Sequence, residues 1–105
     1  MADIKQIIKK IKLKQYEFSK HAVDQSIIRD ISVSELEQAF LGNALVIEDY
    51  PEDKYGASCL VLGYTVRGRA LHVQCSYSTR PLMKIITLYE PDTELWVNNR
   101  VRKNK

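Results

Sequence analysis

The chain contains no apolar run close to the ~20 residues that a membrane-spanning helix requires. Its first residues, MADIKQIIKKIKLK, mix lysine with isoleucine and contain no apolar core of the kind found in signal peptides. The two cysteines and two histidines show no metal-ligand spacing. Repeats, linkers and low-complexity segments are also lacking. We therefore expect a cytoplasmic protein that needs no cofactor or metal and has no membrane partner.

A length of 105 residues suits one domain with one modest core. The net charge of +3 is a mild bias that does not by itself indicate nucleic acid. The positive charge gathers at the two ends of the chain, in Lys5, Lys9, Lys10, Lys12, Lys14 and Lys20 and in Arg100, Arg102, Lys103 and Lys105. Basic ends of this kind either attract phosphate or keep the chain soluble, and both interpretations stay open.

The first half of the chain has the periodicity of amphipathic helices. A basic helix is predicted within residues 1–14, because Ile4, Ile7, Ile8 and Ile11 fall on one face. A short extended stretch follows at residues 16–18, and further helices are predicted over residues 20–29 and 32–42. Ser19 is the expected N-cap of the second helix, and Ser32 with Glu35 has the spacing of a capping box.

From Ala44 the period changes to two residues, which predicts strands near residues 44–49, 58–66, 69–77 and 82–90. After Pro91 a short helix is expected to hold Trp96 as a plug in the core. Because most connections between the strands are hairpins, we expect an α+β fold. In this fold, N-terminal helices pack on a four-stranded antiparallel sheet that a short C-terminal helix follows.

Pairing within the hairpins predicts which side chains share a face of the sheet. A turn at residues 78–81 places His72 opposite Thr87, provided that the turn has an even number of residues. The polar face then holds His72, Gln74, Thr87 and Tyr89, and the core face holds Leu71, Val73, Cys75, Ile86, Leu88 and, by parity, Lys84.

The preceding hairpin is predicted to turn at Arg67-Gly68. This turn places Gly63 opposite His72 and adds Leu60, Leu62 and Tyr64 to the core face. Cys59 and Cys75 would then lie on opposite faces, so we expect free thiols.

The polar face offers the groups that RNA cleavage requires. A base must take the proton of the 2′-OH, an acid must protonate the leaving 5′-oxygen, and cations must stabilise the phosphorane. The candidates are His21, Arg29, His72 and Tyr89, with Arg67, Arg69 and Arg80 at the ends of the sheet. Each also has an ordinary interpretation: a solvated histidine, a strand-forming Tyr89 or Thr87, or a surface arginine.

Several motifs resemble a family of small bacterial proteins long labelled as a domain of unknown function, which is similar to RelE-type toxins of toxin–antitoxin modules. The early motifs are Phe18-Ser19-Lys20-His21-Ala22, Arg29-Asp30-Ile31-Ser32 and Glu35-Leu36. The later ones are Leu71-His72-Val73, Ile86-Thr87-Leu88-Tyr89-Glu90-Pro91-Asp92 and Trp96. The resemblance covers residues 16 to 102, nearly the whole chain.

The resemblance implies the fold shared by barnase and RelE, and a metal-independent endoribonuclease (a hydrolase of the mRNA interferase type) that cleaves through attack of the 2′-OH. The implied catalytic residues are His21, Arg29, His72, Thr87 and Tyr89, and the RNA-binding candidates are Arg67, Arg69, Arg80 and Lys84. The implied partners are RNA, such as ribosome-associated mRNA, and a cognate antitoxin. The basic tail over residues 100–105 is a second source of phosphate contacts. A non-catalytic protein- or RNA-binding module of the same fold is the alternative.

Overall fold

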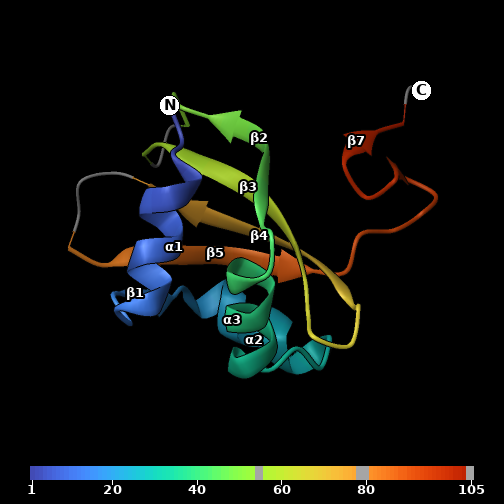
Figure 1. Ribbon diagram of the computed structural model, residues 1–105, viewed down its shortest axis with the longest axis horizontal. Helices are drawn as coiled ribbons and strands as arrows, with labels where there is room; N and C mark the ends of the chain where they lie inside the picture. The colour runs from blue at the N-terminus through green and yellow to red at the C-terminus, as the bar shows by residue number, and fades with distance from the viewer. Residues whose placement is uncertain (54–55, 78–80, 104–105) are drawn as a thin grey trace.

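The computed structural model describes residues 1–53, 56–77 and 81–103, which form three helices and two sheets (Figure 1). The helices are α1 (Ile4–Lys12), α2 (Lys20–Ile28) and α3 (Val33–Leu41). A five-stranded sheet has the order β1-β5-β4-β3-β2, with β1 (Tyr16–Phe18), β2 (Leu45–Tyr50), β3 (Ser58–Tyr64), β4 (Ala70–Ser76) and β5 (Met83–Tyr89). A separate hairpin pairs β6 (Trp96–Val97) with β7 (Val101–Arg102). No helix in the described part of the chain has the length and apolarity needed to cross a membrane.

The three predicted helices are present, and their predicted caps are confirmed. The side chain of Ser19 accepts a hydrogen bond from the Ala22 amide, and Ser32 forms a reciprocal capping box with Glu35. Side chains from all three helices pack on one face of the sheet and form the core, which includes Ile7, Ile11, Ala22, Leu36, Phe40, Val61, Val73 and Ile85. The opposite face of the sheet therefore remains for function.

The predicted four-stranded antiparallel sheet is wrong, because the sheet has five strands and one parallel pair. Residues 16–18 form β1, which runs parallel to β5 with Tyr16 opposite Met83 and Phe18 opposite Ile85. Backbone hydrogen bonds at both ends fix this pairing, from the Met83 amide to the Gln15 carbonyl and from the Ser19 amide to the Ile85 carbonyl, each 2.9 Å. Three residues are too few to show a strand period, so the pattern indicated only an extended stretch.

The predicted C-terminal helix is also wrong, because β6 and β7 form a hairpin there. Asn98 and Asn99 both have positive φ, at 53° and 62°, and the Arg100 amide donates to the Val97 carbonyl at 3.0 Å. Two consecutive left-handed residues make a type I′ turn, which suits the twist of a hairpin, and asparagine tolerates that conformation well. Trp96 is buried as predicted, but against the face of the sheet opposite the helical core.

The turn between β3 and β4 is one residue longer than predicted, which exchanges the two faces of β3. Val66, Arg67 and Gly68 form the loop: the Gly68 amide donates to the Thr65 carbonyl, and Gly68 has φ of 87°. The pairing moves by one residue, so Leu62 rather than Gly63 faces His72. The core therefore takes Cys59 and Val61, whereas Leu60, Leu62 and Tyr64 join the opposite face.

Two consequences follow from this shift. Gly63 faces the helices, and a Cβ built on it would lie 2.0 Å from the carbonyl oxygen of Ala39 in α3, so the close packing of α3 requires glycine there. The predicted separation of the cysteines is wrong as well. Cys59 and Cys75 are paired across the strands on the core face, with their Sγ atoms 4.0 Å apart and both thiols free.

The register of β4 with β5 differs from the prediction by two residues, so the parity of Thr87 and Tyr89 is kept. His72 pairs with Tyr89 and Gln74 with Thr87, and these four side chains share the polar face as predicted. A bulge next to Cys75 then reverses the parity, since Cys75 pairs with Ile85. Ile85 therefore occupies the core instead of Ile86, and Lys84 faces away from the core, contrary to prediction. The predicted turn itself includes residues 78–80, which lie outside the described part.

Candidate functional site

The polar face of the sheet gathers its functional side chains at the C-terminal end of β5, under the β6–β7 hairpin. β4 and β5 supply His72 and Tyr89, which are direct cross-strand partners. The edge strand β2 adds Glu48, which binds Arg102 of the hairpin. We call the group formed by Glu48, His72, Tyr89, Trp96, Asn99 and Arg102 the His72 cluster.

His72 is fully buried, and both of its ring nitrogens have partners. Nε2 lies 2.6 Å from the backbone carbonyl oxygen of Asn99, and Nδ1 lies 3.3 Å from the Tyr89 hydroxyl. A carbonyl oxygen only accepts hydrogen bonds, so Nε2 carries the proton. In the neutral ring Nδ1 is then an acceptor, to which the Tyr89 hydroxyl donates. The contacts thus select one tautomer and aim its lone pair at Tyr89.

Burial lowers the pKa of His72 below its ordinary value of 6.5. The carbonyl of Asn99 and the charge of Glu48 act in the opposite direction, and the charge of Arg102 adds to the lowering. The imidazole is therefore neutral at physiological pH, as a proton acceptor has to be.

Aromatic and ionic contacts hold the hairpin over His72. The rings of Trp96 and His72 meet edge to face with their centroids 4.5 Å apart. The guanidinium of Arg102 lies 4.7 Å from the centre of the Trp96 ring and forms a two-pronged ion pair with Glu48, at 2.7 and 3.1 Å. This ion pair keeps the pKa of Glu48 low, and the Tyr50 hydroxyl also donates to the same carboxylate.

Tyr89 is the member of the pair that solvent reaches, since its side chain is partly exposed whereas His72 is not. Burial raises the pKa of the Tyr89 hydroxyl above its ordinary value of 10.0, so it carries its proton at neutral pH. The charges of Arg102 and Arg29 lower that pKa, and Glu48 raises it. Two cations therefore act electrostatically on the exposed hydroxyl.

The other predicted catalytic residues lie around this cluster. Thr87 is opposite Gln74, next to Tyr89 along the same face, and is partly exposed. Arg29 is the exposed C-cap residue of α2, and its Nε donates to Gln25 at 2.7 Å. His21 is exposed in the first turn of α2, and no hydrogen bond or ring contact within the described residues joins it to His72 or Tyr89. The cap before it, Ser19, binds the carbonyl of Ile86, which is three residues and roughly 10 Å along β5 from Tyr89.

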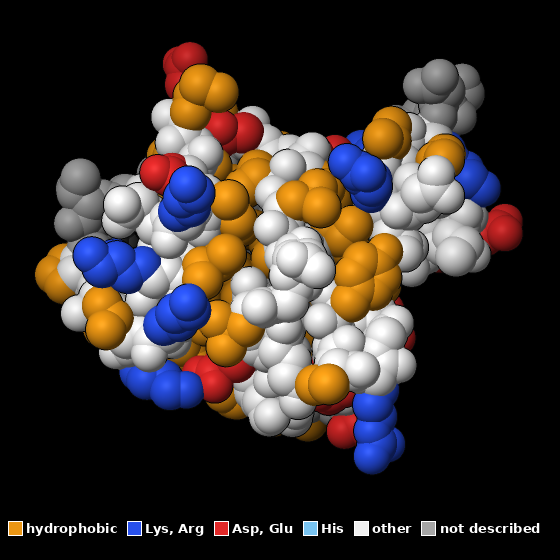
Figure 2. Space-filling view, viewed as in Figure 1, with side chains coloured by type: hydrophobic (Ala, Val, Ile, Leu, Met, Phe, Trp, Pro, Cys, Tyr) orange, Lys and Arg blue, Asp and Glu red, His pale blue; other side chains and the backbone are white. Residues whose placement is uncertain are grey.

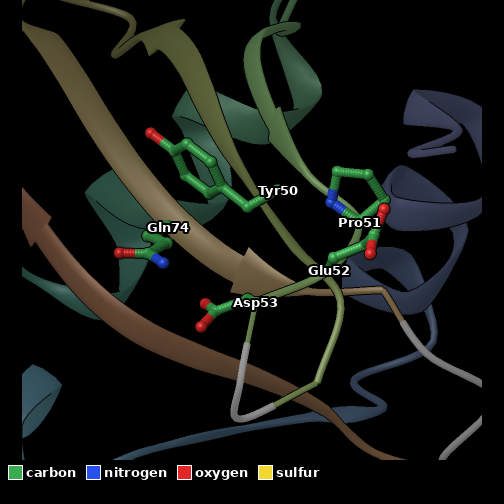
Figure 3. Close-up of a pocket in the computed structure, with 5 residues that line it drawn as sticks. All are labelled: Tyr50, Pro51, Glu52, Asp53 and Gln74. Atoms are coloured by element: carbon green, nitrogen blue, oxygen red, sulfur yellow. The ribbon is translucent and has the colours of Figure 1, made fainter.

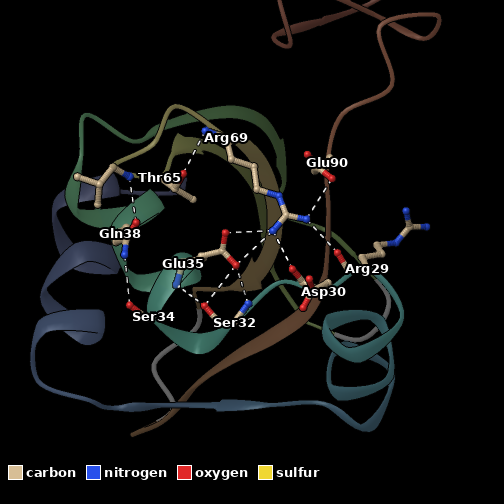
Figure 4. A network of polar contacts seen from close by, with 10 residues as sticks. Arg29, Asp30, Ser32, Ser34, Glu35, Gln38, Thr65, Arg69 and Glu90 are labelled. Atoms are coloured by element: carbon tan, nitrogen blue, oxygen red, sulfur yellow. Dashed lines mark hydrogen bonds and ion pairs between the residues drawn. The ribbon is translucent and has the colours of Figure 1, made fainter.

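Arg69, a predicted RNA-binding residue, is instead held by a network inside the molecule (Figure 4). Its guanidinium donates to the carbonyls of Arg29 and Asp30 at 2.9 and 2.8 Å, and forms ion pairs with Glu35 and Glu90 at 3.1 Å each. These contacts connect the link between α2 and α3 to the end of β5. Arg69 therefore positions the segment that carries Arg29.

The remaining predicted RNA-binding residues are dispersed. Arg67 is exposed in the β3–β4 turn, and Lys84 lies 3.8 Å from Glu17 of β1. Arg80 lies outside the described residues. Figure 2 shows Lys and Arg side chains gathered over α1 and beside the C-terminal hairpin, with apolar surface between them. The β6–β7 hairpin thus supplies the His72 cluster with one cation, Arg102. Arg67 and Lys84 do not belong to that cluster.

A hollow of about 620 Å³ lies beside the cluster, lined by Tyr50, Pro51, Glu52, Asp53 and Gln74 (Figure 3). Gln74 Nε2 donates to Ser58 Oγ at 3.2 Å, and Ser58 donates to Asp53 at 2.9 Å. Two of the lining side chains, Glu52 and Asp53, are carboxylates, so the hollow is unfavourable for anions.

Sequence reasoning missed Glu48 and Asn99. Glu48 lies in the strand predicted near residues 44–49, to which no functional residue was assigned, and Asn99 acts through its backbone carbonyl, which no side-chain pattern records. The adjacent asparagines at 98 and 99 were the available signal for the hairpin. No group of three or more His, Cys, Asp and Glu side chains lies together as a metal site would need, within residues that the structure describes.

Comparison with known proteins gives one family match. The family model described as domain of unknown function (DUF4258) matches residues 18–90, from the end of β1 through the end of β5. No curated protein and no solved structure matches the chain.

Proposed function

The chain belongs to the DUF4258 family, a domain of unknown function, and we propose that it is a metal-independent endoribonuclease toxin of a bacterial toxin–antitoxin module. The observation that carries the proposal is the His72–Tyr89 pair: a neutral, buried imidazole whose Nδ1 accepts a hydrogen bond from the hydroxyl of Tyr89, a partly exposed residue. RNA brings its own nucleophile, so a proton acceptor and nearby cations suffice for cleavage.

In this reaction the 2′-oxygen attacks phosphorus, the bond from phosphorus to the 5′-oxygen breaks, and a 2′,3′-cyclic phosphate forms. Tyr89 accepts the 2′-OH proton while its own proton passes to Nδ1 of His72, 3.3 Å away. The buried imidazole thus acts through the exposed hydroxyl. His21 is the second imidazole of the chain and the candidate acid for the 5′-oxygen, provided that the RNA lies along β5 between Tyr89 and the start of α2.

Charge stabilisation comes from Arg29, whose charge already lowers the pKa of the Tyr89 hydroxyl. Developing negative charge on the phosphorane is favoured beside fixed cations in a partly desolvated site. Thr87 lies next to Tyr89 on the same face and offers a hydroxyl to the phosphate. An enzyme with this site would act on mRNA in the bacterial cytoplasm and be neutralised by a cognate antitoxin.

The direct test is incubation of the purified protein with RNA, with and without chelator, followed by analysis of the new ends. Cyclic phosphate ends that form equally in chelator are expected. Tyr89→Phe removes the hydroxyl and should lower the cleavage rate by about 10²-fold or more, as loss of positioned proton transfer does. Tyr77→Phe is the matched control, because the Tyr77 hydroxyl binds Asp49, outside the cluster.

Full cleavage by a folded Tyr89→Phe variant, or cleavage that chelator abolishes, would contradict the proposal. In cells, expression of the wild-type chain should arrest growth, and His72→Ala and Tyr89→Phe should relieve the arrest.

The complete burial of His72 favours one other function, a binding module without catalysis. In that case the His72 cluster serves to anchor the hairpin, and the surface binds RNA or a partner protein. Retention of RNA by the wild-type protein with no cleavage of any RNA would select this function.

A further inference from the structure

The C-terminal hairpin lies outside the segment that matches the family, yet it is docked on three strands of the main sheet. The Asn99 carbonyl meets His72 on β4, the Asn99 side-chain amide donates to Tyr64 on β3 at 3.2 Å, and Arg102 binds Glu48 on β2. A tail that merely carried positive charge would have no need for partners on three strands.

The backbone conformation of the hairpin directs the Asn99 carbonyl toward His72. Asn98 and Asn99 turn the chain through two left-handed residues, and the Lys103 amide donates to the Leu95 carbonyl at 2.9 Å, which closes the base of the hairpin. Trp96 packs its ring edge to face on the imidazole and is only 5% exposed. The orientation of His72 is thereby fixed on two sides, by Tyr89 from β5 and by the hairpin.

The tautomer has a functional consequence. Were Nδ1 protonated instead, it would donate toward Tyr89, and the hydroxyl could no longer pass its proton to the ring. The Asn99 carbonyl prevents this, because it accepts a hydrogen bond from Nε2 and so keeps the proton on that nitrogen. The third member of a catalytic triad orients its histidine in the same way.

We propose that the C-terminal hairpin, residues 92–103, is an integral part of the site, in which Asn99 positions His72 and Arg102 locks the hairpin closed during the reaction. This inference rests on the proposed function, since it assigns the proton acceptor of that same site. Asn99 and Arg102 act through His72 and the hairpin, so they are positioning residues. The substrate meets Tyr89 while the hairpin stays in place.

The groups that face His72 determine how its pKa should respond when the hairpin is released. They are Tyr89 from β5, Glu48 from β2 and Arg102 from β7. Freeing the hairpin hydrates the imidazole, and loss of the Arg102 charge removes a cation that disfavours its protonation. Both effects raise the pKa of His72, and because burial is the largest influence on that pKa they outweigh the loss of the Asn99 carbonyl, which acts in the opposite direction.

The experiment uses the full chain with Arg102→Gln, and Arg100→Gln as a matched control that removes an exposed charge from the same hairpin. Nitrogen-15 NMR of the imidazoles reads the tautomer and the pKa of His72, with His21 as the only other histidine in the spectrum. We expect the Nε2-protonated tautomer in the wild type. Arg102→Gln should raise the pKa of His72, mix the two tautomers and lower kcat by up to about 10²-fold, with KM less affected. Arg100→Gln should leave the tautomer and the pKa of His72 unchanged.

Charge reversal gives an independent check on folding. Glu48→Arg and Arg102→Glu should each mix the two tautomers and lower the rate, and the double variant should restore the wild-type tautomer and much of the rate. Rescue shows that the ion pair matters rather than either residue alone.

Two results would overturn the proposal: an Nδ1-protonated ring in the wild type, or a cleavage rate that stays the same or rises when Arg102→Gln frees the hairpin. A rising rate would mean that the hairpin is an inhibitory cover. If the wild type cleaves no RNA, the proposed function fails, and the NMR arm still decides whether the hairpin fixes the tautomer of His72.

Discussion

At the scale of single residues, His72 has a hydrogen-bond partner at each ring nitrogen although its side chain is fully buried. Satisfying both nitrogens removes the penalty of burying a polar ring, but only for the neutral form. The contacts that favour the neutral imidazole therefore make the folded protein sensitive to acid.

This coupling predicts a pH dependence of stability. The pKa of His72 is lowered in the folded state relative to about 6.5 in the unfolded chain, so between these values the unfolded state binds more protons. The stability due to His72 is fully present above pH 6.5 and is lost as the pH falls through the folded-state pKa. Urea unfolding from pH 7 to pH 5 should show this decline in the wild type and in His21→Gln, whereas His72→Gln should lack it.

The range from pH 7 to pH 5 lies above the pH at which the carboxylates of the fold take up protons. Glu35, Glu37 and Glu48 have pKa values lowered from 4.5, so the stability that they contribute is present above that pH and is lost only at more acid pH. An equal decline in His72→Gln would show that another group titrates with unfolding.

At the scale of secondary-structure elements, periodicity located the helices and strands, but turn length and a bulge decided their faces. The polar face of β4 and β5 was predictable because the error in register was two residues, which keeps parity. The faces of β3 were not, because Gly68 allows either a two-residue or a three-residue turn and the sequence does not distinguish them. The bulge beside Cys75 has no sequence signal either, so Ile85 and Lys84 were placed on the wrong faces.

The observed register of β3 predicts that Gly63 cannot be replaced. Any Cβ there would lie 2.0 Å from the Ala39 carbonyl oxygen, so Gly63→Ala must push α3 away from the sheet. We expect a loss of more than about 2 kcal/mol in the free energy of unfolding, as overpacking in a core causes. Gly42→Ala is the comparison: its Cβ would lie 3.3 Å from the Gln38 carbonyl oxygen, which a shift of a few tenths of an ångström relieves, so it should cost clearly less than Gly63→Ala. Equal midpoints of chemical denaturation for the two variants would refute the register.

At the scale of the whole molecule, contacts between segments distant in sequence complete the site. Arg102 reaches Glu48 across 54 positions of the chain, and Arg69 joins Arg29, 40 positions away, to the end of β5. Sequence reasoning identified His72 and Tyr89 as candidates because they lie on the polar face of two predicted strands. It identified Arg29 from its place at the end of the second predicted helix. It could not pair them with Asn99 or Glu48, because those pairings depend on where the hairpin docks.

The contacts of Arg69 distinguish it from Arg67, the other arginine near the β3–β4 turn. Arg69 makes four contacts through one guanidinium, with the side chain only 23% exposed, whereas Arg67, two residues earlier, is exposed in the turn. Arg69→Ala removes charge-assisted hydrogen bonds to two backbone carbonyls and two ion pairs, so it should cost about 1.5–3 kcal/mol in the free energy of unfolding. Arg67→Ala should change it by less than about 0.5 kcal/mol.

Denaturation curves measure the two costs, and RNA affinity is measured for each folded variant in parallel. If Arg69→Ala is as stable as Arg67→Ala but binds RNA more weakly, Arg69 contacts phosphate and the network is incidental. The expected result is the opposite: because the guanidinium is already bound within the fold, its loss loosens the α2–α3 link and with it the position of Arg29 beside Tyr89.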